Sequence, residues 1–157
     1  MKKVIILLFL LNVFSTSFVR AVDLKLEIGK WNFADDEIYC IIGSYPIKQD
    51  VPEGKKRGDT FVLVYRMNKS PDAIIEIRAG YPYDEKKPVE IKIDKNSYKF
   101  YSKDDSAWTS KDKEVIFAMK KGNTMIIKGL SSKGTITIDT YTLKGFTTAF
   151  NKLFNNC

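Results

Sequence analysis

The chain has 157 residues, a formal net charge of +7 and no histidine. The absence of histidine excludes serine–histidine and cysteine–histidine hydrolases and removes the commonest metal ligand. The lysines are scattered among alternating segments instead of forming a basic block. This distribution is typical of a solvated surface, so we expect no nucleic-acid partner.

Residues 1–21 have the layout of a secretory signal peptide, with two early lysines and an apolar run at 4–14. That run has eleven residues, too few for a membrane span, which needs ~20. Val19 and Ala21 fit the small-residue positions before a cleavage site, so we expect cleavage after Ala21. One domain, 22–157, would remain, with a charge of +4 once the three basic residues of the leader are gone. We therefore expect an exported protein, in the periplasm, on the outer membrane or secreted, without a transmembrane span in the mature chain.

Short alternating runs broken by glycine, proline, asparagine and aspartate follow the leader, and each predicts a β-strand. In chain order they are 24–33, 37–44, 60–67, 75–79, 89–94, 97–101, 123–129 and 135–143. The run 60–67 is apolar on both faces, which is typical of a strand in the middle of a structure. Seven or eight such strands predict an all-β domain, a β-sandwich or a small barrel.

The run 135–143 changes phase, because Ile136 and Ile138 share one face whereas Tyr141 and Leu143 fall on the other. We therefore predict a bulge or twist near Asp139. The preceding S-S-K-G stretch is predicted to be a turn. The threonines that follow are good strand formers and need no catalytic role.

Two segments break the period of two. Residues 111–121 predict a short helix, introduced by Thr109 and Ser110 and stopped by Gly122. A second, terminal helix begins at Phe146, where apolar side chains recur at steps of three and four up to the last residue.

The chain has two cysteines, Cys40 and Cys157. In an exported chain an even cysteine count points to a disulfide. Cys157 lies on the apolar stripe of the terminal helix, so the bond would fix that helix to the sheet. In the chain-entropy model a loop of this size stabilises the fold by about 4–5 kcal/mol.

The motifs that suggest chemistry are weak. Ser110 and Lys113 have the Ser-x-x-Lys spacing of some acyl-transfer enzymes, but the companion motifs are missing, and a serine here is typical of a helix cap. The acidic groups 35–37 and 104–105 lack the ligand spacing of a calcium loop and are typical of turns. The sequence therefore predicts no catalytic residues, metal or cofactor. A catalytic pair of carboxylates, as in glycoside hydrolases, is not excluded by the sequence, because the fold and not the sequence spacing sets the distance between the two groups.

The stretch G-Y-P-Y-D-E, 80–85, places Tyr81 and Tyr83 around a proline between two predicted strands. We expect at least one ring to be exposed, and exposed tyrosines suit contact with a partner. In the alternative, Tyr81 closes the end of the core and the proline shapes the turn. Trp108 could likewise be either a contact residue on the surface or part of the core, and we expect it in the core.

The string A-M-K-K-G-N-T-M-I-I-K-G-L-S-S-K-G-T-I-T-I-D-T-Y-T-L-K-G-F, 118–146, resembles the bacterial invasion-associated locus B family. The I-Y-C near residue 40, the K-R-G-D-T-F-V-L-V run and the G-Y-P-Y turn extend the resemblance over about 37–157. It implies an exported, immunoglobulin-like β-sandwich with a closing helix. The pair Cys40 and Cys157 matches, and no established catalytic residues are carried over.

We therefore expect an exported, non-enzymatic protein that binds a macromolecular partner of the envelope or host surface, with Tyr81 and Tyr83 at the contact. The family's name connects such binding with host-cell adhesion or invasion. Two alternatives stay open. One is a small-ligand carrier with a pocket between the sheets, and the other is a periplasmic hydrolase that uses carboxylates.

Overall fold

The computed structural model describes residues 24–35 and 38–157, so the predicted signal peptide lies outside the described residues. The strands are β1 (Asn32–Asp35), β2 (Tyr39–Ser44), β3 (Lys48–Asp50), β4 (Phe61–Met67), β5 (Ile74–Arg78), β6 (Val89–Ile93), β7 (Asn96–Lys103), β8 (Ser106–Trp108), β9 (Thr124–Leu130) and β10 (Ile136–Thr142). The helices are α1 (Asp112–Lys121) and α2 (Phe146–Asn155). Within the described ranges, no helix is both long enough and apolar enough to cross a bilayer.

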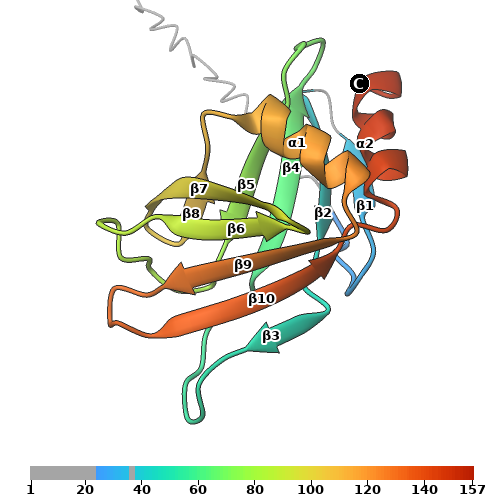
Figure 1. Cartoon of the computed structure of the whole chain (residues 1–157). Helices are drawn as coiled ribbons and strands as arrows, with labels where there is room; N and C mark the ends of the chain where they lie inside the picture. Colours follow the sequence, from blue (N-terminus) through green and yellow to red (C-terminus); the bar gives the residue numbers. More distant parts are fainter. Residues whose placement is uncertain (1–23, 36–37) are drawn as a thin grey trace, which may run out of the picture.

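The strands form one antiparallel sheet in the order β1-β2-β4-β5-β8-β7-β6-β9-β10-β3, which curls on itself (Figure 1). The curl passes through β7, whose first residues pair with β6 and whose last residues pair with β8. The part of the sheet from β1 to β8 therefore faces the part from β6 to β3. Residues 45–47 lead directly from β2 to β3 and join the two halves a second time, with the Ile47 amide donating to the Thr140 carbonyl at 2.8 Å.

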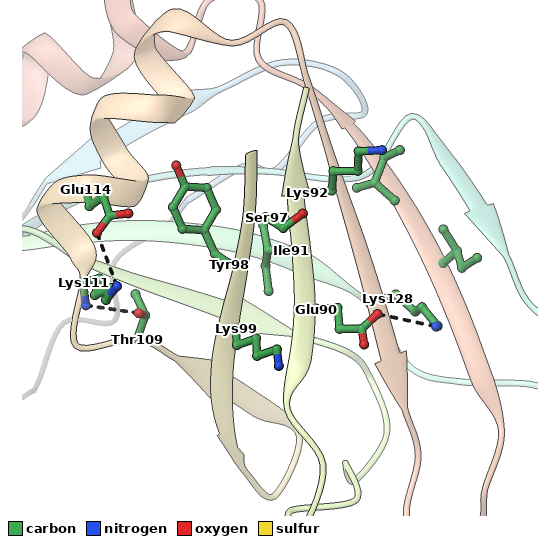
Figure 2. Close-up of a pocket in the computed structure, with 12 residues that line it drawn as sticks. Glu90, Ile91, Lys92, Ser97, Tyr98, Lys99, Thr109, Lys111, Glu114 and Lys128 are labelled. Atoms are coloured by element: carbon green, nitrogen blue, oxygen red, sulfur yellow. Dashed lines mark hydrogen bonds and ion pairs between the residues drawn. The ribbon is translucent and has the colours of Figure 1, made fainter. Parts of the chain in front are cut away.

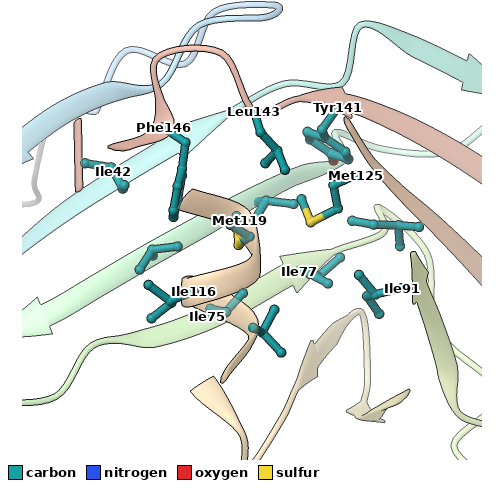
Figure 3. Close-up of a cluster of buried hydrophobic side chains, with 14 of the residues drawn as sticks. Ile42, Ile75, Ile77, Ile91, Ile116, Met119, Met125, Tyr141, Leu143 and Phe146 are labelled. Atoms are coloured by element: carbon teal, nitrogen blue, oxygen red, sulfur yellow. The ribbon is translucent and has the colours of Figure 1, made fainter. Parts of the chain in front are cut away.

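Side chains from both halves fill the space between them (Figure 3). Those with at most 2% exposure include Ile42, Val62, Val64, Ile75 and Ile77 from one half and Ile91, Ile93, Met125, Ile127 and Tyr141 from the other. Met119 of α1 and Phe146 of α2 complete this core, and both are fully buried. The predicted all-β class, with a short helix near 111–121 and a closing terminal helix, is confirmed.

Residues 24–33 do not form the predicted strand. Isolated bridges, including Glu27 to Lys30, hold a turn at Gly29, whose φ is +69°, and β1 begins only at Asn32. Leu26 instead covers Gly43 of β2 so closely that a Cβ there would lie 2.6 Å from its Cδ2 atom. The alternation of apolar and polar residues in this segment therefore reflects the packing of some of its side chains against β2, and it does not mark a strand of the sheet.

Strand β10 has no bulge. Its seven residues pair one to one with β9, from Ile136 opposite Leu130 to Thr142 opposite Thr124. The buried face carries Thr137, Asp139 and Tyr141, while Ile136 is 48% exposed on the other face. Of the two predicted features, a bulge or a twist, the bulge is absent, and the phase changes because a charged residue, Asp139, occupies a core-facing position. Ile136 and Ile138 lie on the opposite face of the strand.

The predicted disulfide is present between Cys40 of β2 and Cys157, with the Cα atoms 6.0 Å apart. It fixes the end of the chain, just beyond α2, to the sheet. Arg66 of β4 strengthens this attachment. Its Nη1 atom donates to the Leu153 carbonyl at 2.6 Å, and its guanidinium carbon lies 4.3 Å from the ring centroid of Phe154.

We predict that Cys157→Ser lowers the free energy of unfolding by about 4–5 kcal/mol, because the closed loop no longer constrains the unfolded chain. Urea denaturation followed by tryptophan fluorescence measures this loss. Cys40→Ser should give the same value, and a reductant should destabilise only the wild-type protein. Equal stability of the oxidised and reduced wild-type protein would contradict the prediction.

Candidate functional site

The G-Y-P-Y turn between β5 and β6 closes one end of the core. Tyr83 is 4% exposed, and its ring meets that of Tyr81 edge-on with 5.4 Å between centroids. Both rings lie over Gly129 of β9, where a Cβ would collide with the Tyr81 hydroxyl. This burial leaves Tyr83 almost no surface for a partner, so the predicted contact role does not fit it. Tyr81 is half-buried and lines a cavity.

A contact between two glycines brings the segment before β4 against this turn. The Gly58 amide donates to the Gly80 carbonyl at 2.9 Å, and a Cβ on Gly80 would collide with the Gly58 carbonyl. Gly80 also has a φ of +70°, which favours glycine. The approach places Arg57 beside Tyr81, with 6.0 Å from its guanidinium carbon to the ring centroid.

A buried ion pair joins the same segment to β10. Both Nη atoms of Arg57 donate to the carboxylate of Asp139, one of them at 2.9 Å, and the two side chains are 6% and 5% exposed. Nη2 also donates to the Gln49 side chain at 2.8 Å. Burial alone would lower the pKa of Arg57, but the hydrogen bond and the charge of Asp139 outweigh burial and raise it. The guanidinium therefore stays charged, and its planar fork is occupied by Asp139.

Beside this ion pair lies a cavity of about 330 Å³, here named the basic cavity. Its lining side chains are Val51, Lys55, Lys56 and Arg57 from the segment between β3 and β4, Tyr81 and Pro82 from the turn, and Ser131, Ser132, Lys133, Thr135 and Thr137 from the β9–β10 hairpin. Three of these side chains are lysines, and none of the described lining residues is acidic. None of the three lysines has a carboxylate of a described residue within ion-pair distance.

Hydrogen bonds hold the hydroxyl groups of the basic cavity in place. The Tyr81 hydroxyl and Thr137 Oγ1 are 2.6 Å apart, and burial raises the pKa of Tyr81, so its proton stays on at neutral pH. Ser131 Oγ accepts the Thr135 amide at 3.0 Å and closes the tip of the hairpin. The stretch 131–134 therefore forms the predicted turn, and it also forms one wall of the cavity.

A larger cavity of about 670 Å³ lies along β6, β7 and β9 beside the start of α1 (Figure 2). Its aliphatic side chains are Ile91, Ile126 and Ile138. Two of its four lysines pair with its two glutamates, Lys128 with Glu90 at 3.5 Å and Lys111 with Glu114 at 3.6 Å. Lys92 and Lys99 form no ion pair with a described residue. It differs from the basic cavity in that its lining includes carboxylates, which pair with two of its lysines.

The structure does not support a reactive Ser110. Lys113 forms an ion pair with Asp72 at 2.7 Å. Capping by Ser110 was also wrong, because the N-cap of α1 is Lys111, without a side-chain cap. The hydroxyl of Thr109 accepts the Lys111 amide at 3.1 Å instead.

The other residues singled out from the sequence lie apart from both cavities. Asp104, with a φ of +51°, turns the chain between β7 and β8, as predicted for 104–105. Two members of the acidic group 35–37 lie outside the described residues. Trp108 is half-buried, with its ring centroid 6.2 Å from that of Tyr101.

The family model for the invasion associated locus B (IalB) protein matches residues 39–154. The chain belongs to the IalB family. Its fold is similar to the crystal structure of invasion associated protein B from Bartonella henselae, with 14% sequence identity and a TM-score of 0.57. That similarity covers 87% of this chain and 97% of the Bartonella chain, and at this identity it establishes the fold alone. No curated protein matches the chain.

Every residue that lines the basic cavity lies within the IalB match. The sequence patterns gave no indication of this cavity, because its three segments are far apart in the chain. The available signal was the phase change at Asp139. A carboxylate on the core face of a strand requires a buried cation, and Arg57 is that cation.

We predict that Asp139→Asn lowers the free energy of unfolding by about 3–5 kcal/mol, because it leaves the buried charge of Arg57 without a partner. The matched control is Asp50→Asn, which breaks the exposed ion pair with Lys48 and should cost less than about 1 kcal/mol. Denaturant unfolding of both variants gives the comparison. If both variants lost the same small amount of unfolding free energy, the Arg57–Asp139 pair would not be what holds the segment before β4 in place.

Proposed function

We propose that this IalB-family protein is an exported, non-enzymatic binding module, and that its basic cavity engages a macromolecule of the bacterial envelope or host surface. The leader-like sequence of residues 1–21 and the disulfide support export, because disulfides persist in oxidising compartments. The name of the matched family supports a role in host-cell invasion.

The observation that carries the proposal is that three lysines without an ion-pair partner among the described residues line the basic cavity. Lys55, Lys56 and Lys133 reach it from two segments that the Arg57–Asp139 pair holds together. A pocket with a few convergent polar groups on a rigid base is the usual form of a binding site. Tyr81, the predicted contact residue that retains some exposure, forms part of its wall.

The larger cavity favours a second candidate function, the carriage of a small ligand. Its volume of about 670 Å³ lies within the usual range for small-molecule sites. Its aliphatic side chains and alternating charges suit an amphiphilic molecule.

A pair of tryptophan substitutions separates the two candidates. Ser132 and Ser97 are both exposed, and each lines one of the cavities, Ser132 the basic one and Ser97 the larger one. We predict that Ser132→Trp, which fills the basic cavity, lowers binding of the labelled protein to envelope fractions or host cells by about tenfold or more, because hot-spot contacts dominate affinity. Ser97→Trp, the matched control, should leave binding within about twofold.

Circular dichroism and thermal unfolding would establish that both variants are folded. Loss of binding in Ser97→Trp alone would place the contact at the larger cavity and refute the assignment to the basic cavity. Unchanged binding in both variants would remove both cavities from consideration.

A further inference from the structure

We propose that the basic cavity binds a phosphorylated sugar unit of a glycan. This inference rests on the proposed function of the cavity and adds the chemistry of the partner. It follows from the charge of the cavity, the geometry of its donors, one buried donor without a partner, and the cavity's size and lining.

The charge of the cavity favours an anion. Arg57 and Asp139 neutralise each other, so the lysines at 55, 56 and 133 leave an excess of three positive charges. An anion bound in the cavity would be attracted to these positive charges. A phosphate monoester carries about −1.5 to −2 charges at pH 7, more than a single carboxylate supplies.

The donor geometry favours phosphate over carboxylate. A planar carboxylate is best matched by the fork of an arginine, and the only arginine in the cavity lining uses both Nη atoms on Asp139. The other lining residues with side-chain donors are lysines and hydroxyl residues, which come from different segments. Lysine binds phosphate as a point charge, and a tetrahedral group presents oxygens in several directions.

Arg57 also has a donor to spare. Its side chain is 6% exposed, and its Nε atom has no hydrogen-bond partner among the described residues. A buried N–H without an acceptor costs about 1–3 kcal/mol, so such groups in folded proteins call for an explanation. Because Arg57 lines the cavity, a ligand oxygen near it would satisfy this donor.

The remaining lining suits a sugar. A volume of about 330 Å³ lies at the lower end of the range for ligand sites and suits one small organic unit better than an ion alone. Val51, Pro82 and the ring of Tyr81 provide apolar surface for the C–H face of a sugar ring. Ser132 and Thr135 provide hydroxyls for its hydroxyl groups.

The test is a titration of the oxidised protein, followed by NMR, with four small probes of matched chemistry. These are glucose 6-phosphate, glucose, glucuronate and inorganic phosphate. Glucose 6-phosphate should bind about tenfold or more tightly than glucose and glucuronate, and more tightly than inorganic phosphate. Its affinity should fall steeply as the salt concentration rises from about 50 to about 500 mM.

A lysine variant tests whether the site is the basic cavity. Lys55→Gln with Lys56→Gln and Lys133→Gln should weaken glucose 6-phosphate binding about tenfold or more. The matched control replaces Lys95, Lys144 and Lys152, three exposed lysines outside the cavity, and should change the affinity less than about twofold. Equal effects of the two triple variants would overturn the assignment.

Other outcomes separate the two proposals. If glucuronate binds as well as glucose 6-phosphate, or if phosphatidylglycerol vesicles bind and the sugar phosphate does not, the ligand class is wrong. If Ser132→Trp abolishes binding to cells while glucose 6-phosphate fails to bind, the ligand class falls and the proposed function stands. If Ser132→Trp leaves binding to cells unchanged, the proposed function falls, and the ligand inference that rests on it falls too.

Discussion

The ion pair between Arg57 and Asp139 is the constraint on which the site depends. Asp139 lies on the inward face of β10, and Arg57 precedes β4, so the pair joins the two halves of the curled sheet. Both side chains are almost fully buried, so water could not solvate either charge if the ion pair were broken. The segment before β4 is therefore held against β10 by an interaction that is costly to break, and the adjacent lysines are presented from a fixed base.

The glycine contact and the ion pair act on the same short segment. Gly80 lets the two backbones approach, because a Cβ at this position would collide with the Gly58 carbonyl, and the approach places Arg57 next to Tyr81. Gly129 of β9 likewise has no side chain, which leaves room for the rings of Tyr81 and Tyr83. The walls of the basic cavity are thus set by packing before any ligand arrives, which limits the entropy lost on binding.

Local patterns predicted much of the fold but little of the site. The alternation of apolar and polar residues located most strands, and the spacing of apolar residues at steps of three and four located α2. The even number of cysteines indicated the disulfide. Each of these signals lies within one segment or one pair of residues. Strands β3 and β8, of three residues each, are too short to alternate visibly. The error at Asp139 and the failure to find the cavity have one cause. A core-facing carboxylate looks like a break in a pattern until its partner, 82 residues away in the chain, is known.

The two ends of strand β10 lead to different parts of the fold, one to the basic cavity and the other to the disulfide-bonded end of the chain. Its beginning, next to the hairpin at 131–135, lines the basic cavity, and its end leads through Leu143 into α2 and the disulfide. The covalent bond and Arg66 secure the helical end, where a loose terminus would otherwise fray. The buried ion pair secures the other end independently. The unpaired lysines of the basic cavity therefore lie on segments that a separate, buried ion pair joins, so the fold does not depend on ion pairs of these lysines.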